Sequence, residues 1–319
     1  MKIFESFIES QNIPKVQFLM LFGKLSSPAN KEQKELNEKT RDIFYEYFII
    51  PEDKEKEVKL DSERPVINYR KERSEDIIKQ NKINKCYNNW KTNFTFTSDK
   101  IKFHKNLNEF DFIPKTVFNL EEIDKLKFPI IAKPADGLSG VGIEKFDNIE
   151  EAKKSKLKFD LWSECIDFKR EFRAIYLKEN LFILYERIPS GNGEMVIGKK
   201  KPDEKLEFTY IEQDTDKIEF INELNNIVKK VRKKGMNTDI FSLDIFIDKN
   251  DKIWVIEINS GTGLGSNSLA KLYGAIYKDF YNKDITEKIN SKIEEISDEY
   301  KSIIKKYFSK EYKKSYKPL

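Results

Sequence analysis

Three oxygen-bearing side chains near the ends of one predicted β-hairpin have types and a spacing that suit a metal site. Asp244 lies on the first strand, and Glu257 and Asn259 lie on the second. If Asn250-Asp251 forms a two-residue turn, Asp244 lies directly opposite Glu257, with about 5 Å between their Cβ atoms. Asn259 shares their face, because side chains on a strand alternate between the two faces of a sheet. The hairpin therefore gathers three oxygen ligands on one face.

Two carboxylates this close together favour a bound cation. At an effective dielectric constant near 20, they repel each other by roughly 3 kcal/mol. Asp, Glu and Asn oxygens suit Mg²⁺, which usually brings substrate phosphates with it. The alternative is a pair of solvated acids on an exposed sheet face.

Apolar residues alternate with these polar ones and predict one buried face for the hairpin. The glycine-rich turn at 260–265 follows the second strand, and Ser266 or Ser268 then caps a helix with an apolar stripe. A helix start with free amides and hydroxyl groups is a ready site for a carboxylate or a phosphate. The residues expected on the buried face are Phe241, Leu243, Ile245, Ile247, Trp254, Ile256 and Ile258.

A second group of residues has the pattern of a phosphate site. The strand 128–133 ends in Lys133, and a loop with three glycines and a serine follows at 137–142. Loop amides beside a strand-borne cation can bind polyphosphate oxygens. The GxxGxG spacing is neither a P-loop nor a Rossmann fingerprint. A mobile hairpin is the alternative.

A helix with a lysine in its first turn begins near residue 100. Ser98 is expected to be the N-cap, and Phe103 and Leu107 supply the apolar stripe. Lys100 opposes the helix dipole, which a nearby phosphate would explain, although a solvated lysine is the alternative. His104 is the only histidine and is expected to be a packing or surface residue. Its solitude argues against a His-ligated zinc and against Ser-His or Cys-His catalysis.

Further strands and a helix connect these groups. Glu171 and Arg173 share one face of a strand over 171–177, as a cross-strand ion pair or as the wall of a site. An amphipathic helix spans 221–231 and ends at Gly235. Residues 1–98 contain no catalytic motif. They predict strands at 16–22 and 66–69 and a helix over 35–48.

Composition excludes several classes of protein. The 319 residues are 39% hydrophobic and 36% charged, with a net charge of +4, which predicts no nucleic-acid partner. Cys86 and Cys165 fit no CxxC pattern, so we expect a reducing compartment and a cytoplasmic protein. Glu5 and Glu9 do not fit a signal peptide, and the apolar run 16–22 is too short to cross a membrane.

The order of these parts resembles the ATP-grasp superfamily. A lysine opening a helix, a strand lysine, a glycine loop, an acidic hinge and an Asp strand paired with a Glu-x-Asn strand follow one another over 99–281. The run EINSGTGLGSNSL at 257–269 is most similar to the D-alanine–D-alanine ligase branch. The resemblance implies an α+β fold in which two α+β subdomains clasp ATP. The implied divisions are an N-terminal α/β domain at 1–98, a lid subdomain at 99–165, a C-terminal subdomain with the metal site at 166–290 and a basic helical tail at 291–319.

The resemblance also implies a role for each candidate residue. The implied nucleotide site has Lys100 and Lys133 on the α- and β-phosphates, a lid with Gly137, Ser139, Gly140 and Gly142, an adenine hinge of Glu164, Cys165 and Ile166, and Glu171 on the ribose. Asp244, Glu257 and Asn259 would hold two Mg²⁺ ions, with Mn²⁺ as a substitute. Arg187, Arg173 and Gly263 would take part in catalysis, and Ser266 and Ser268 would bind the acceptor carboxylate.

The implied reaction joins a carboxylate and an amine on small-molecule or peptide substrates. ATP phosphorylates the carboxylate, and the amine then attacks the acyl phosphate to give an amide. The dipeptide ligase branch has an arginine two residues before its metal Asp, where this sequence has Ser242. Either Arg173 or Arg187 replaces that arginine, or the substrate is not D-alanine. A phosphotransferase acting on a hydroxyl and an inactive nucleotide-binding protein are the alternatives, and a homodimer is compatible with the sequence.

Overall fold

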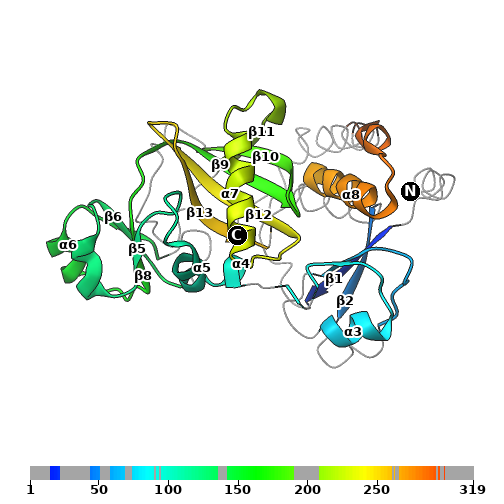
Figure 1. Cartoon of the computed structure of the whole chain (residues 1–319), viewed down its shortest axis with the longest axis horizontal. Helices are drawn as coiled ribbons and strands as arrows, with labels where there is room; N and C mark the ends of the chain where they lie inside the picture. The colour runs from blue at the N-terminus through cyan, green and yellow to red at the C-terminus, as the bar shows by residue number, and fades with distance from the viewer. Residues whose placement is uncertain are drawn as a thin grey trace, which may run out of the picture. The chain divides into compact units, whose positions relative to one another are not determined.

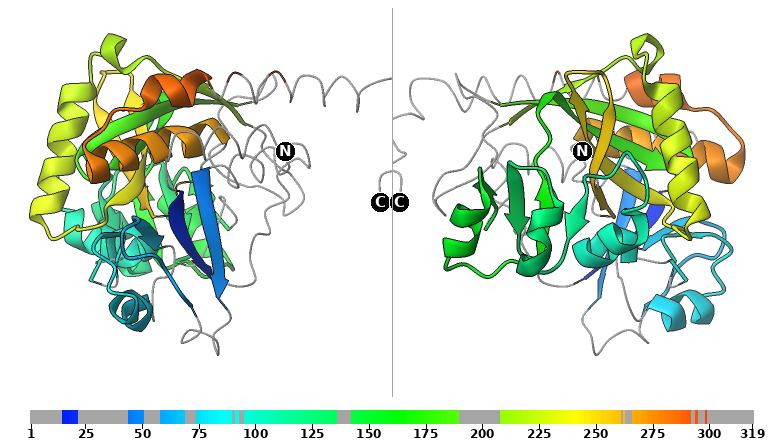
Figure 2. Two further views of the ribbon diagram at one scale, coloured as in Figure 1. Left: turned by 90° about the vertical axis from the view of Figure 1, so that its right-hand side faces the viewer. Right: turned by 60° about the vertical axis from the view of Figure 1, so that its left-hand side comes forward.

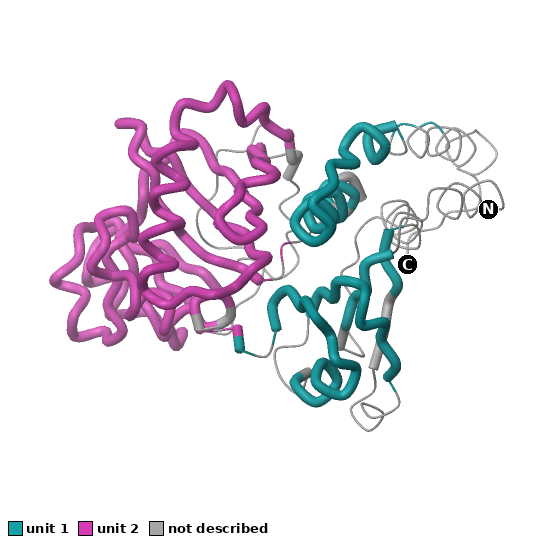
Figure 3. The backbone as a smooth tube through the Cα atoms, turned by 45° about the vertical axis from the view of Figure 1, so that its right-hand side comes forward, with its two compact units in different colours: residues 1–91, 263–319 teal, residues 92–262 magenta. Residues whose placement is uncertain are grey.

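The computed structural model describes the two β-rich parts of the chain and most of their helices. The described residues are 15–21, 44–50, 58–68, 74–89, 91–92, 95–135, 142–189, 208–260, 262, 266–291, 294 and 298. The chain divides into two compact units (Figure 3). Unit 1 comprises residues 1–91 and 263–319, and unit 2 comprises residues 92–262. The four divisions expected from the sequence stay a prediction.

Unit 1 contains a four-stranded parallel sheet in the order β2-β1-β3-β4. Leu19, Val66 and Ile77 lie in its apolar core. The predicted strands at 16–22 and 66–69 are confirmed as β1 and β3. The predicted helix over 35–48 is wrong at 45–48, which belong to β2, and its residues 35–43 lie outside the described residues. The elements are β1 (Val16–Leu21), β2 (Tyr45–Ile50), β3 (Val66–Asn68), α3 (Ser74–Gln80), β4 (Cys86–Tyr87) and α8 (Ser266–Tyr281).

Unit 2 contains two sheets joined through residues 165–167. The small sheet is antiparallel and has the order β5-β8-β6-β7. Its elements, with the helices before and around them, are α4 (Thr95–Ser98), α5 (Lys100–Leu107), β5 (Thr116–Val117), the 3-10 helix η2 (Leu120–Lys125), β6 (Ile130–Lys133), β7 (Glu144–Phe146), α6 (Ile149–Lys154) and β8 (Leu161–Glu164).

The large sheet of unit 2 is antiparallel and has the order β11-β10-β9-β12-β13. The helix α7 (Ile221–Lys233) packs along one of its faces, as Figures 1 and 2 show. It ends as predicted, because Gly235 follows it with a φ of +99°, a conformation that side chains rarely adopt. The other elements are β9 (Phe168–Leu177), β10 (Asn180–Pro189), β11 (Phe208–Glu212), η3 (Thr215–Lys217), β12 (Ile240–Asp248) and β13 (Ile253–Asn259).

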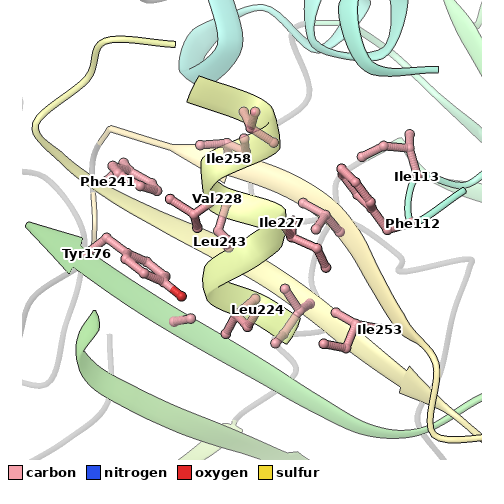
Figure 4. Close-up of a cluster of buried hydrophobic side chains, with 14 of the residues drawn as sticks. Phe112, Ile113, Tyr176, Leu224, Ile227, Val228, Phe241, Leu243, Ile253 and Ile258 are labelled. Carbon is pink, nitrogen blue, oxygen red and sulfur yellow. The ribbon is translucent and has the colours of Figure 1, made fainter. Parts of the chain in front are cut away.

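The apolar face of α7 packs against the large sheet (Figure 4). Its buried residues recur at helical spacing and meet the apolar faces of β9, β12 and β13. The buried residues of α7 are Leu224, Ile227, Val228 and Val231, and those of the strands are Phe172, Ala174, Tyr176, Phe241, Leu243, Ile245, Ile247, Ile253, Val255 and Ile258.

The β12–β13 hairpin differs from its prediction in turn and burial but not in the pairing that matters. The backbone N–H of Asp248 donates to Lys252 O at 3.1 Å, which leaves a three-residue loop. Asp251 takes a positive φ of 64° within it. An irregularity between Asp244 and Ile245 then shifts the register by one residue. Asp244 therefore still pairs with Glu257, as predicted.

The bulge also changes which residues of β13 are buried. Ile253 and Val255 lie in the core, whereas the predicted Trp254 and Ile256 are only partly buried. One extra residue on a strand exchanges its two faces, and the prediction omitted that residue. At the outer edge of β13, the backbone N–H of Val255 donates to Phe112 O at 2.8 Å.

The start of α5 also differs from its prediction. Ser98 is the last residue of α4 and not the N-cap. Asp99 is the cap, and its carboxylate accepts a hydrogen bond from the Lys102 backbone N–H at 2.9 Å. Asp and Ser are equally good N-caps, and Ser98 is not available because it belongs to α4. Within the described residues, none of the helices is long and apolar enough to cross a membrane.

The fold predicts that truncating α7 on its buried face destabilises unit 2. Leu224 is fully buried, so Leu224→Ala is expected to lower the free energy of unfolding by about 2–5 kcal/mol. Lys229 is exposed on the same helix, and Lys229→Ala is expected to change it by less than about 0.5 kcal/mol. Denaturant unfolding of both variants checks the packing, and equal effects would contradict it.

Candidate functional site

One face of the large sheet is polar, opposite the face that packs on α7. We call this the polar face and define it by six side chains from four adjacent strands. The strand register places Arg187 opposite Glu171, Arg173 opposite Asp244, and Asp244 opposite Glu257. The polar face comprises Arg187 of β10, Glu171 and Arg173 of β9, Asp244 of β12, and Glu257 and Asn259 of β13.

Ion pairs cross the polar face between neighbouring strands. Arg173 Nε donates to Asp244 Oδ1 at 2.7 Å, and Arg173 Nη2 donates to Asp244 Oδ2 at 2.8 Å. Arg187 Nη1 donates to Glu171 Oε1. Asp244 is only 8% exposed, so its pair with Arg173 is shielded from water. Glu171 and Arg173 thus both form cross-strand ion pairs, and both lie on the wall of one polar surface.

The metal-ligand candidates gather at the β12–β13 end of the polar face. Asn259 Nδ2 lies 3.5 Å from Asp244 Oδ2, at the long limit of a hydrogen bond. Among the described residues, no group of three or more His, Cys, Asp and Glu is placed to hold a metal ion. The donor set is therefore two carboxylates and one amide. Such an all-oxygen set fits Mg²⁺ with further oxygens from phosphates and water, and it also admits Mn²⁺.

Lys133 of the small sheet lies near Glu257 of the large sheet. Burial lowers the pKa of Lys133; the charge of Glu257 raises this pKa, and the charge of Lys100 lowers it further. Within the described residues, the Lys133 amino group has no hydrogen bond or ion pair with the protein. The structure thus places Lys133 within electrostatic reach of the other predicted lysine and of a candidate metal carboxylate. A partly desolvated cation in this position suits a polyphosphate.

His104 lies behind these lysines and is 3% exposed, so its prediction as a packing residue is confirmed. Its Nδ1 lies 3.0 Å from Thr116 Oγ1. The Thr116 hydroxyl also lies 2.8 Å from Pro114 O, to which it can donate. Ser163 Oγ lies 2.8 Å from the same oxygen. Burial, and secondarily the charge of Lys133, lowers the pKa of His104 to about 3.

The predicted hinge connects the small and large sheets. The Lys127 backbone N–H donates to Glu164 Oε1 at 3.0 Å, and the Cys165 backbone N–H donates to Pro129 O at 2.9 Å. The Cys165 thiol is free and partly buried, and burial raises its pKa. Ile166 is also partly buried. The hinge is therefore fixed to the loop before β6, the strand that carries Lys133.

Several predicted site residues lie elsewhere or outside the described residues. Gly142 has a φ of +76°, which side chains rarely adopt, and an added Cβ would meet Pro134 Cγ at 3.1 Å, so a larger residue there would be strained. Ser266 begins α8 of unit 1, and Ser268 is buried in the same helix. The predicted residues outside the described part of the chain are Gly137, Ser139, Gly140 and Gly263.

The structure adds polar residues that sequence reasoning missed. Thr116 and Ser163 hold His104 in place, and no sequence motif marks them. Ser242 is fully buried on the strand of Asp244, and its hydroxyl has no hydrogen-bond partner among the described residues. Only the departure from the ligase pattern at this position pointed to Ser242.

Comparison with solved structures identifies the fold. The D-alanine–D-alanine ligase from Bacillus anthracis complexed with ATP shares 14% identity, with 91% of this chain and 99% of that chain covered and a TM-score of 0.52. Another structure of the D-alanine–D-alanine ligase from Bacillus anthracis shares 16% identity and has a TM-score of 0.52; the match covers 78% of this chain and 87% of that chain. The N5-carboxyaminoimidazole synthetase from Staphylococcus aureus complexed with ADP shares 14% identity and has a TM-score of 0.50; the match covers 77% of this chain and 71% of that chain. No family model and no curated protein matches the chain.

The predicted fold is confirmed by these likenesses. The chain is an α+β protein with the ATP-grasp fold, as the D-alanine–D-alanine ligase structures have. At this level of identity the likeness shows the fold alone, and the roles of individual residues have to come from the geometry of the polar face.

His104 predicts a loss of stability in acid. The pKa of about 3 in the folded chain is below the ordinary value of 6.5, so the unfolded chain binds the proton first as the pH falls. The stability contribution is complete above pH 6.5 and falls by about 1.4 kcal/mol per pH unit between pH 6.5 and 3. Unfolding of the wild type and His104→Gln at pH 7.5 and 5 checks this.

The comparison uses the change in the free energy of unfolding between the two pH values in each protein. A loss of stability that the substitution causes equally at both pH values therefore does not affect it. Between these two pH values, the wild type is expected to lose about 2 kcal/mol more than His104→Gln, because the unfolded wild type takes up one more proton. Equal pH dependence in the two proteins would show that His104 titrates normally.

Proposed function

We propose that this chain is an ATP-dependent carboxylate–amine ligase that forms an amide through an acyl phosphate. One observation carries the proposal most strongly: Lys133 lies within electrostatic reach of Lys100 and of Glu257, whose cross-strand partner is Asp244. Two cations and two carboxylates meeting between two sheets suit a metal-bound polyphosphate. The ligases named above, which share the fold, support the choice of reaction class.

In the proposed site, the residues of unit 2 bind the nucleotide. Lys100 and Lys133 neutralise phosphate oxygens, and Glu171 accepts from the ribose hydroxyls. Residues 164–166 line the adenine, and the lid residues of the 137–142 loop cover the phosphates. Asp244, Glu257 and Asn259 hold Mg²⁺, or Mn²⁺ in its place, which when bound neutralises the phosphate charge and aligns the γ-phosphoryl group.

The proposed chemistry transfers one phosphoryl group and then releases it. A substrate carboxylate oxygen bonds to the γ-phosphorus, and the bond from that phosphorus to the β–γ bridging oxygen breaks, which releases ADP. The substrate amine then bonds to the acyl carbon, loses a proton to solvent and expels phosphate. Arg187 and Arg173 stabilise the charge that develops in these steps, so the chain needs no nucleophile of its own.

The substrates are proposed only as a class. Gly263, Ser266 and Ser268 precede or begin a helix, where amides and hydroxyls can bind a substrate carboxylate, which favours an amino acid or a peptide. Ser242 stands where the dipeptide ligase branch has an arginine, so D-alanine is not assigned.

Replacing Lys133 is expected to weaken nucleotide binding. Lys133→Met keeps the length of the side chain but removes its charge, and a charged hydrogen bond contributes about 1.5–3 kcal/mol, or roughly 10–150-fold in Kd. Lys145 is exposed on β7 of the same sheet, and its pair with Asp147 is a surface contact, so Lys145→Met is the matched control. Calorimetric titration with ADP checks both variants, and equal affinities would contradict the assigned role of Lys133.

The reaction class is tested by product analysis. The chain is incubated with ATP, Mg²⁺ and a panel of amino acids and short peptides, and products are identified by mass. A ligase gives ADP, phosphate and a condensed product, all lost in Glu257→Gln. Phosphorylated alcohols with ADP would instead establish a phosphotransferase, and nucleotide binding without any turnover over a broad panel would count against catalysis.

A further inference from the structure

We propose that Arg173 makes divalent-metal binding depend on the nucleotide, by occupying Asp244 until a polyphosphate arrives. The inference rests on the proposed function for the identity of the ligand, but its geometry belongs to the chain alone. Arg173 and Asp244 are cross-strand partners on β9 and β12.

The ion pair occupies the oxygens that a metal would need. Arg173 Nε and Nη2 donate to different oxygens of Asp244, at 2.7 and 2.8 Å. The planar guanidinium matches a carboxylate in this forked arrangement better than any other side chain does. Asn259 Nδ2 approaches the second oxygen at 3.5 Å. Each of these hydrogen bonds uses a lone pair of the carboxylate, so a cation that takes both oxygens of Asp244 has to displace the Arg173 guanidinium.

The charges near the site explain why a metal alone is disfavoured. Asp244 and Glu257 contribute two negative charges, Arg173 lies on the first, and Lys133 lies near the second. The four groups are neutral together, so a divalent ion alone makes the site positive. Lys100, which also affects Lys133, makes it more positive still. A polyphosphate supplies the negative charge that lets the metal and the cations coexist.

Arg173 then has a second use once it leaves Asp244. Its Cα pairs with Asp244 on one side and with Tyr185 on the other, and it lies two residues from Glu171 on the same strand face. A released guanidinium therefore stays on the polar face. There it adds positive charge toward the transferred phosphoryl group. Binding of the metal to Asp244 therefore also frees the Arg173 guanidinium to interact with the phosphates.

The chain offers a matched control on the same strand. Arg170 Nε and Nη2 donate to Glu186 Oε1 and Oε2 at 2.7 and 2.8 Å, which is the same forked geometry. Arg170 lies over the ring of Phe172, and its partner is not a metal-ligand candidate. Removing Arg170 therefore breaks an equivalent ion pair without exposing Asp244.

The test measures Mn²⁺ binding without nucleotide, by electron paramagnetic resonance of the free ion. Arg173→Met is expected to bind Mn²⁺ at least about tenfold tighter than the wild type, because it leaves Asp244 without its guanidinium partner and the site one positive charge poorer. Arg170→Met is expected to match the wild type. Arg173→Met combined with Asp244→Asn is expected to lose the gain, which places the new binding at Asp244.

A second variant keeps the test decisive if Arg173→Met does not fold. In Arg173→Lys a compact ammonium replaces the forked guanidinium and cannot bond both oxygens of Asp244 in the same way. This variant is therefore expected to gain less Mn²⁺ affinity than Arg173→Met does. Mn²⁺ affinity equal to the wild type in a folded Arg173 variant overturns the inference. Wild-type chain that binds no ADP contradicts the proposed function instead, and the Mn²⁺ comparison still decides the role of Arg173.

Discussion

Two carboxylates held on neighbouring strands of one sheet need positive charge beside them, and the rest of unit 2 meets this need. Asp244 and Glu257 face each other across the β12–β13 ladder. Arg173 supplies the compensating charge within the sheet, and Lys133 supplies it from the small sheet. Arg173 belongs to the same sheet as the two acids, whereas Lys133 belongs to the small sheet. The attraction between Lys133 and Glu257 therefore also favours contact between the two sheets of unit 2.

The rigidity of this arrangement comes from the opposite side of the sheet. The apolar faces of β9, β12 and β13 pack on α7, so the polar face is backed by a continuous core. A strand fixed on one face cannot slip by a single residue without burying its charges. The core therefore determines the pairing of Arg173 with Asp244 as firmly as the ion pair itself does.

The sequence allowed prediction of the features that depend on local pattern. Alternation predicted the two faces of β12, and the order of lysines, glycine loop and acids indicated the fold. The pairing of Asp244 with Glu257 was predicted from a two-residue turn, and it holds because the bulge offsets the extra residue of the actual turn. The sequence did not reveal the three-residue turn or the bulge, because Asp251 in the left-handed region and an extra residue in β13 leave no distinctive composition. It also left the partner of Arg173 open, because that depends on β9 and β12 becoming neighbours although the two residues are 71 positions apart in the sequence.

The hydrogen bond from Val255 to Phe112 has a consequence for self-association. An edge strand with unpaired amides can recruit a strand from another molecule. Here the carbonyl of Phe112 takes an outward amide of β13, two residues before Glu257. At this point the border of the large sheet is bonded to the chain's own backbone, so another strand that pairs at Val255 has to displace Phe112.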